Sequence, residues 1–238
     1  MIVNRRTIGL SFLALVLILL CVRASIWQFD RYQIRHENNQ LIQRNLSKPV
    51  IGESQLANNP SSIAWRTITI TGAFVPKNEI LVRGRYHQDV YGYAVVTLFR
   101  SESGRYYWVD RGWVRAGADA KTAPATQAVT GEQLSITGRV RVESLERQVS
   151  GALFALSNGR GTSTLAHWNQ EKSIGTQPVY IDLIKTSNSK FNPAFPSEVP
   201  TLSDGPHLSY SFQWLLFAGF VIFGWVLIMR EERRQAKR

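Results

Sequence analysis

The run LSYSFQWLLFAGFVIFGWVLIM, residues 208–229, decides the architecture of this chain of 238 residues. It contains no Asp, Glu, Lys or Arg, and as a helix rising about 1.5 Å per residue it is about 33 Å long. That length crosses a bilayer core of about 30 Å, so we expect a membrane span. The start of the span carries hydrogen-bonding and metal-ligating side chains, namely His207, Ser209, Tyr210, Gln213 and Trp214. A simple anchor needs no imidazole, and we expect the chemistry at this end.

A second apolar run, residues 8–22, follows two arginines near the N-terminus. The basic start, the short apolar core and Val-Arg-Ala at residues 22–24 also fit a cleaved signal peptide. Apolar character resumes through Ile26 and Trp27, which favours an uncleaved span within residues 1–29, with the Arg23 side chain reaching toward the interface. Two basic residues precede the first span and five follow the second, so the positive-inside rule predicts cytoplasmic termini and an extracytoplasmic central part.

The charge and the motifs exclude several classes of protein. The net charge of +11 is spread along the chain without a tract rich in Lys and Arg, so we expect the lipid bilayer and no nucleic acid as a partner. The single cysteine, Cys21, allows no intrachain disulfide. No Walker loop, dinucleotide fingerprint, CxxC, HExxH or Gly-x-Ser-x-Gly motif is present, and the four histidines are not spaced like metal ligands. We therefore expect that the protein is not an enzyme.

Between the two spans the sequence pattern changes from helical to strand-like. Residues 30–48 contain no Gly or Pro, which predicts that the first helix continues beyond the membrane as a juxtamembrane helix. Residues 49–186 show the period-two alternation of strands. We expect strands at residues 65–71, 79–83, 92–100, 106–114, 133–142 and 179–184, with turn signals such as Pro-Lys-Asn at 76–78 and Ser-Asn-Gly-Arg-Gly at 157–161.

These patterns predict a membrane α+β fold, in which two transmembrane helices flank one antiparallel β domain, a sandwich or a small open barrel. Residues 187–206 contain four prolines and are predicted to form an irregular linker back to the bilayer. The second span then covers residues 207–229, and residues 230–238 form a basic cytoplasmic tail.

The aromatic and imidazole side chains near the membrane surface have two interpretations each. His207 is either an interfacial histidine at a helix start or an axial ligand for haem iron, since imidazole is a usual protein ligand of that metal. Trp27, Tyr210 and Trp214 either belong to the aromatic belt at the bilayer surface or line a groove for a planar ligand.

The string Val-Asp-Arg-Gly-Trp-Val at residues 109–114 resembles a signature of the Surfeit locus protein (Surf-one) family of cytochrome oxidase assembly factors. Three further pieces match in order: Trp27-Gln28-x-x-Arg31 after the first span, Ile-Leu-Val-Arg at 80–83 leading into Gly-Tyr at 92–93, and His207-Leu-Ser-Tyr210 with Gln-Trp at 213–214. Because two spans flank one β domain as well, the resemblance covers essentially the whole chain.

The resemblance implies a role in assembling haem-copper cytochrome c oxidase, with bacterial members binding haem a and helping to place it in the large catalytic subunit. The histidine that the family offers as haem ligand matches His207, although many members have Asn residues immediately before it, where this chain has Gly205-Pro206. No Arg- and Ser-rich transit peptide precedes the first span, which favours a bacterial plasma membrane. The alternative is a scaffold that binds the nascent oxidase or its haem a synthase and never touches haem.

If the two spans pack side by side, haem a could lie between their aromatic residues, with its iron on His207 and its propionates near Arg31 or Arg23. Arg111, in the signature string, either forms an ion pair with Asp110 that orders the β domain or faces a propionate or a partner subunit. The expected metal ligand is His207, and the expected cofactor-binding residues are His207, Tyr210, Trp214, Trp27, Arg31 and Arg111.

Overall fold

The computed structural model describes residues 5–57, 60–117, 123–142, 153–154, 169–170 and 173–235. The chain divides into two compact units. One unit is helical and combines the two ends of the chain, Met1–Gln40 and Thr201–Arg238, and the other is the β domain, Leu41–Pro200.

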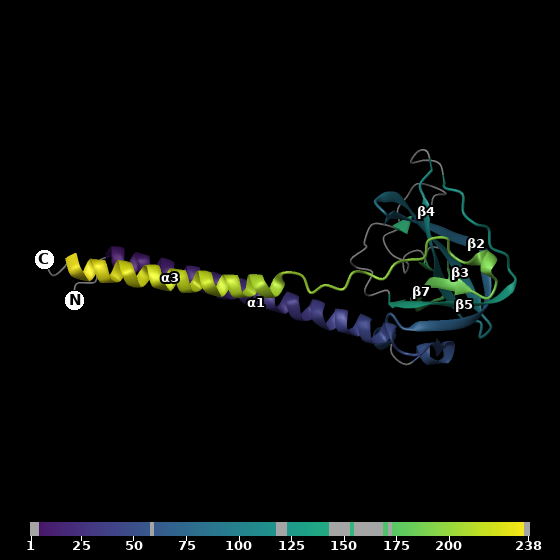
Figure 1. Cartoon of the computed structure of the whole chain (residues 1–238), viewed down its shortest axis with the longest axis horizontal. Helices are drawn as coiled ribbons and strands as arrows, with labels where there is room; N and C mark the ends of the chain where they lie inside the picture. Colours follow the sequence, from purple (N-terminus) through teal and green to yellow (C-terminus); the bar gives the residue numbers. More distant parts are fainter. Residues whose placement is uncertain are drawn as a thin grey trace. The chain divides into compact units, whose positions relative to one another are not determined.

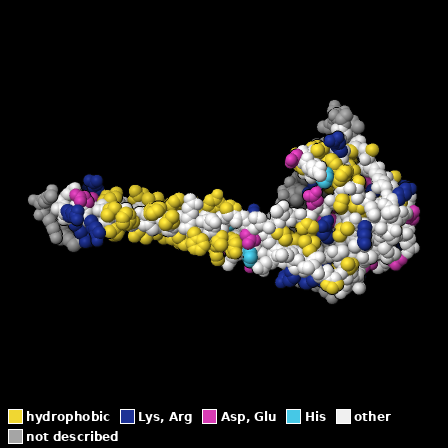
Figure 2. All heavy atoms as spheres, in the orientation of Figure 1, with side chains coloured by type: hydrophobic (Ala, Val, Ile, Leu, Met, Phe, Trp, Pro, Cys, Tyr) yellow, Lys and Arg dark blue, Asp and Glu magenta, His cyan; other side chains and the backbone are white. Residues whose placement is uncertain are grey.

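The helical unit is built from α1 (Arg5–Leu46), of which the last six residues belong to the β domain, and α3 (His207–Gln235). Both helices contain a stretch long and apolar enough to cross a membrane, with mean hydropathy of 2.4 in α1 and 2.1 in α3. Helix α1 continues through Arg23 without a break, because nothing between the apolar run and Leu46 interrupts a helix. Apolar side chains cover the middle of both helices, and Lys and Arg gather at the end that carries both termini (Figure 2).

Helices α1 and α3 lie antiparallel and are joined by polar contacts along their length (Figure 1). Near the termini, the Thr7 hydroxyl donates to the Glu232 carboxylate at 2.7 Å. Near the start of α3, Ser25 and Ser211 are both buried, and each hydroxyl donates to the backbone carbonyl of the other residue, at 3.0 and 3.1 Å. Since apolar surfaces gain nothing by meeting in lipid, small residues and hydrogen bonds of this kind fix how such helices pack.

The β domain is a ring of five strands: β2 (Thr67–His87), β3 (Val90–Ser101), β4 (Tyr106–Arg115), β5 (Gln133–Val142) and β7 (Thr176–Thr186). The strands are hydrogen-bonded in the order β2-β3-β4-β7-β5, and β5 pairs back with β2, so the sheet closes into a small barrel. The short strands β1 (Ile51–Gly52) and β6 (Leu153–Phe154) add to β2. Most pairs are antiparallel, as predicted, but β4–β7 and β1–β2 are parallel, so the sheet is mixed.

The core of the β domain lies inside this ring. Along β5 every second residue is buried, which is the pattern expected of a strand with one face in a core. The main cluster includes Ile68, Phe74, Phe99, Tyr107, Val109, Ile136 and Ile181, each nearly free of solvent contact. The 3-10 turns η1 (Glu53–Ala57), η2 (Pro60–Ile63) and η4 (Ser189–Phe191) lie in the same domain. At the end of α1, the buried Asn45 side chain donates to the carbonyls of Ser62 and Ala64 and holds this helix end on the domain.

Two of the predicted strands are one strand in the structure. The Pro-Lys-Asn sequence at residues 76–78 was expected to be a turn, but it lies inside β2, at a register shift between Phe74 and Glu79. Proline cannot donate to a ladder, and an irregularity of this kind is where a strand tolerates it. The reversal comes instead at Gln88 and Asp89, which both have positive φ, as in a tight hairpin turn. The turn signal at residues 157–161 lies outside the described residues.

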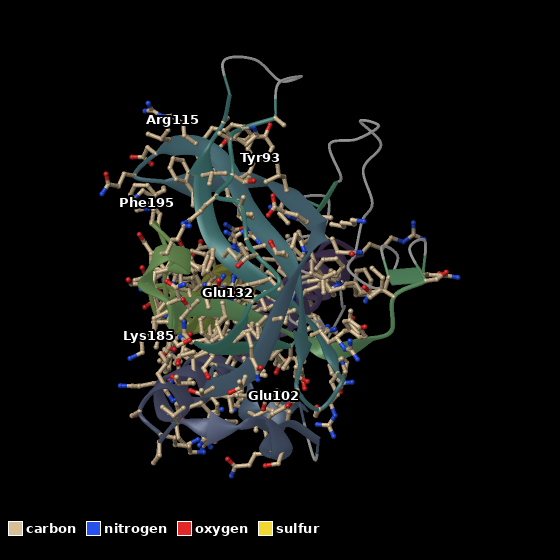
Figure 3. The ribbon with its side chains drawn as sticks, turned by 90° about the vertical axis from the view of Figure 1, so that its right-hand side faces the viewer. Tyr93, Glu102, Arg115, Glu132, Lys185 and Phe195 are labelled. Atoms are coloured by element: carbon tan, nitrogen blue, oxygen red, sulfur yellow. The ribbon has the colours of Figure 1, made fainter. Side chains whose placement is uncertain are left out.

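The predicted linker contains a segment that docks on β4, residues 193–199, which we term the strap. The Trp113 backbone N–H donates to the Phe195 carbonyl at 2.8 Å, and the Ser197 hydroxyl donates to the Asp110 carboxylate at 2.9 Å. Gly112, between them, has φ of +94°, and a Cβ there would lie 2.3 Å from the Phe195 carbonyl oxygen. In Figure 3 Phe195, Tyr93 and Arg115 lie toward one end of the domain and Glu102 toward the opposite end.

We predict that Gly112→Ala displaces the strap and destabilises the domain. The left-handed backbone strains any residue with a Cβ, at a cost of about 1–3 kcal/mol, and the steric overlap adds to it. The melting temperature of the purified chain in detergent should fall by about 2–4 °C for each kcal/mol lost. The matched control is Gly131→Ala, because a Cβ at Gly131 would meet nothing within 4 Å. Equal melting temperatures for the two variants would contradict the assigned role of Gly112.

Candidate functional site

The candidate site lies at the first turn of α3, where His207 begins the helix. Gly205 has φ of +68°, which suits glycine, and the Tyr210 backbone N–H donates to the Pro206 carbonyl at 3.0 Å to form the first helical turn. The Gly205-Pro206 sequence therefore supplies the sharp turn that directs the chain into α3. His207 itself is half-buried.

Gln28 of α1 is the hydrogen-bond partner of His207. Its side-chain Oε1 lies 2.8 Å from Nδ1 of His207, so an amide oxygen of one helix is placed to accept a proton from the imidazole on the other helix when Nδ1 carries it. In that tautomer the second ring nitrogen, Nε2, carries a lone pair and no proton. Among the described residues Nε2 has no hydrogen-bond partner, which leaves it available to a metal or another donor.

The other histidines in the described part of the chain are arranged differently. His36 has both ring nitrogens occupied, with Nδ1 2.8 Å from the Asp204 carboxylate and Nε2 2.8 Å from the Gln40 amide. His87 faces Glu198 at 3.4 Å and packs against the rings of Trp113 and Phe195 in the β domain. His167 lies outside the described residues. Of the three histidines that the structure describes, His207 is thus the best placed to ligate a metal.

Asp204 fixes the chain three residues before His207. Its carboxylate accepts from the Asn39 amide at 2.8 Å and contacts His36 at 2.8 Å, and both groups are on α1. The hydrogen bonds from His36 and Asn39 hold the pKa of Asp204 below its usual value. The turn before His207 is therefore held to α1 by His36 and Asn39, which lie beyond the apolar stretch of that helix.

The other predicted site residues of the helical unit lie close in sequence to either Gln28 or His207. Trp27 and Arg31 lie within one turn of Gln28, and Tyr210 and Trp214 lie within two turns of His207. The two indole rings each pack on their own helix, Trp27 beneath the Arg31 guanidinium at 5.8 Å and Trp214 edge-on to Phe217 at 5.7 Å. Trp27, Tyr210 and Trp214 are 50%, 46% and 36% exposed, and such rings offer apolar surface to lipid or to a ligand.

Comparison with known protein families places the chain in one of them. The sequence profile of the SURF1 family matches residues 15–219, a stretch that includes Gln28, the whole β domain and His207. The chain belongs to the SURF1 family.

Individual relatives are distant in sequence but similar in extent. An uncharacterised SURF1-like protein of Mycobacterium bovis is 26% identical over 230 residues, covering 88% of this chain and 80% of the relative. The corresponding protein of Mycobacterium tuberculosis strain H37Rv has the same values. A SURF1-like protein of Rickettsia felis is 24% identical over 224 residues and covers 92% of this chain and 96% of its own length.

The signature string of this SURF1 family member serves the β domain through both faces of β4. Arg111 is 7% exposed, and its guanidinium pairs with Glu79 at 3.0 Å and donates to the Gln127 carbonyl at 2.7 Å. Burial lowers the pKa of Arg111, and Glu79 opposes that effect. Of the two interpretations of Arg111, the ion pair with Asp110 does not occur, because neighbouring strand residues point to opposite faces and Arg111 pairs with Glu79 instead. Its described contacts all lie within the β domain.

Asp110 occupies the other face of β4, beneath the strap. Its carboxylate accepts from the Gly112 backbone N–H at 2.8 Å as well as from Ser197, and it lies in register with the buried Asp182 of β7. Asp182 in turn pairs with Arg141 at 2.7 Å. Burial, and next the charge of Asp182, raise the pKa of Asp110 to about 6. The sequence had no signal for this carboxylate pair, because β4 and β7 are far apart along the chain.

The raised pKa of Asp110 predicts a pH dependence of stability. An unfolded Asp titrates near pH 3.9, so between about pH 4 and 6 the folded state holds more protons than the unfolded state, and stability falls as the pH rises through that window. The loss is on the order of 2–3 kcal/mol and is complete above about pH 7. Asp110→Asn should flatten this part of the profile of melting temperature against pH. Asp89→Asn, at an exposed turn, should leave the profile as it is in the wild type. Parallel profiles for all three proteins would contradict the prediction.

Proposed function

We propose that the protein is a membrane-bound assembly factor for haem-copper cytochrome c oxidase, which holds haem a for delivery to the large catalytic subunit. The observation that carries this proposal is the state of His207, whose Nδ1 is engaged by Gln28 while Nε2 has no partner among the described residues. Membership of the SURF1 family supports the oxidase as the recipient. The role is one of binding and transfer and involves no catalysis.

The residues around His207 fit a haem group. Imidazole nitrogen is a usual ligand of haem iron, and His207 would hold it through Nε2. The exposed rings of Trp27, Tyr210 and Trp214 would cover apolar parts of the macrocycle and exclude water. Arg31, or Arg23 about two turns closer to the membrane centre, would pair with a propionate, because a guanidinium binds a carboxylate with two parallel hydrogen bonds. When bound, the group would supply its iron, its planar ring and its propionates to these contacts.

The contacts between the two helices support a particular membrane arrangement. The Thr7–Glu232 contact brings the first turns of α1 and the last turns of α3 to the same end, and that end carries the flanking arginines. We infer that both termini are cytoplasmic in a bacterial plasma membrane and that the β domain is extracytoplasmic. His207 then lies at the outer surface of the bilayer. From this position it can reach other proteins of the same membrane, namely the large subunit of the oxidase as recipient and haem a synthase as donor.

This topology predicts the outcome of reporter fusions. Alkaline phosphatase, which is active outside the plasma membrane, should be active when fused after Ser61. A fluorescent protein that is active in the cytoplasm should be active when fused after Arg238, since the second span returns the chain to that side. Measurement of alkaline phosphatase and fluorescent-protein activity at both positions provides the check. The same side for both reporters would overturn the two-span arrangement.

A second candidate function is a scaffold for the nascent oxidase or its haem a synthase that does not bind haem. The exposed aromatic rings of the β domain favour it, because Tyr86, Tyr91 and Phe195 are 67%, 38% and 43% exposed and such rings are common in interfaces. An apolar patch is visible on this domain in Figure 2. Under this alternative the wild-type protein binds an oxidase subunit while carrying no haem.

The haem proposal predicts that His207→Ala loses the ligand and keeps the anchor. Protein purified from cells that make haem a should show a haem absorption band in the wild type and less than about one tenth of it in His207→Ala. The variant should accumulate in the membrane, because residues 208–229 still span it. His87→Ala, in the β domain, is the control and should keep the band. A haem content equal to wild type in His207→Ala would show that the ligand is wrongly assigned, and a wild type without haem would favour the scaffold.

A further inference from the structure

The contact between Gln28 and His207 joins residues 179 positions apart in sequence, and neighbouring contacts fix it on both sides. On the membrane side, Ser25 and Ser211 exchange hydrogen bonds one turn away. On the outer side, Asp204 is held by His36 and Asn39 of α1. The two helices therefore cannot slide past each other without breaking polar contacts above and below the imidazole.

We propose that Gln28 is a positioning residue, whose side-chain carbonyl accepts the Nδ1 proton of His207 and so presents Nε2 with its lone pair to a metal centre. The identity of the metal group in this inference rests on the proposed function. The tautomer that the inference assigns to His207 is independent of the proposed function. Gln28 itself touches neither metal nor cofactor in this scheme. It acts on the ligand through one hydrogen bond.

The physical basis is the asymmetry of a neutral imidazole. One ring nitrogen carries the proton and the other the lone pair, and an acceptor beside Nδ1 places the proton there. Ligating histidines are generally oriented in this way, by a carboxylate, a backbone carbonyl or water at the nitrogen that does not bind the metal. Here the acceptor is an amide from a second transmembrane helix, so the correct tautomer depends on the packing of α1 against α3.

The choice of an amide has a chemical consequence. A carboxylate at position 28 would add a negative charge next to the ring and make the imidazole a stronger electron donor. The neutral amide orients the ring without that charge, and the ligand remains a weaker donor. A protein that must hand its cargo to another is served by such a ligand, since a moderate bond to the metal is released more readily.

The tautomer can be measured without any metal. We expect nitrogen NMR of the full chain in detergent, labelled at histidine and kept at about pH 8 so that imidazole is neutral, to show the His207 proton on Nδ1. The His207→Ala spectrum assigns the signals. Gln28→Leu should move the proton to Nε2, the form preferred by an imidazole without such an acceptor. Gln33→Leu is the matched control, because Gln33 is an exposed glutamine on the same helix. An Nε2 proton in the wild type, or no change in Gln28→Leu, would overturn the proposal.

A second measurement tests the consequence for ligation, with haem a added to the metal-free protein. Affinity in Gln28→Leu should fall about 10–100-fold, the range found for lost partners of metal-ligating histidines. Gln28→Glu should restore binding, because it keeps an acceptor, and should lower the reduction potential of the bound group relative to wild type. Gln33→Leu should bind as wild type does.

The two possible failures are distinguishable. If the wild type does not bind haem a, the proposed function fails, and the NMR result alone decides the role of Gln28. If the wild type binds haem a through His207 and Gln28→Leu binds equally well with an unchanged spectrum, the proposed function stands and the positioning role of Gln28 is wrong.

Discussion

The contact between Ser25 and Ser211 is the constraint on which the arrangement of the helical unit depends. Apolar side chains that face lipid do not specify how two spans pack, because lipid is as apolar as they are. The two buried hydroxyls, each bonded to the backbone of the other helix, select one register. In that register Gln28 meets His207 one turn away, and Asp204 meets His36 and Asn39 beyond it. A candidate ligand is thus oriented by helix packing.

The β domain solves a different problem, that of closing a short mixed sheet. Strand β2 is long enough to pair with β3 along most of its length and with β5 along its first third, which closes the ring. The signature string on β4 contributes to this on both faces. Arg111 pairs with Glu79 on one face. On the other face, the Asp110 carboxylate accepts hydrogen bonds from Ser197 of the strap and from the backbone N–H of Gly112. The contacts of Asp110, Arg111 and Gly112 in this string therefore have a structural explanation within the β domain.

The membrane anchor and the candidate site occupy different residues of the helical unit. Residues 208–229 contain what is needed to cross a bilayer, while His207 and the turn before it lie just outside that run. A change at His207 or Gln28 therefore leaves the apolar run intact. The β domain carries exposed aromatic rings of its own, among them Phe195 of the strap (Figure 3), and exposed rings of this kind are common in protein interfaces.

The sequence by itself determined the two apolar helices, the helical continuation of α1 to Leu46, most of the strands and the candidate His207, because each depends on local composition and periodicity. It did not predict the parallel pairing of β4 with β7, the continuity of β2 through Pro76, or the pairing of Arg111 with Glu79 instead of Asp110. Nor did it identify Gln28 as the partner of His207, although Gln28 stood in a family motif. These features were decided only by the tertiary structure, because each joins residues, or selects a register, that local periodicity does not specify.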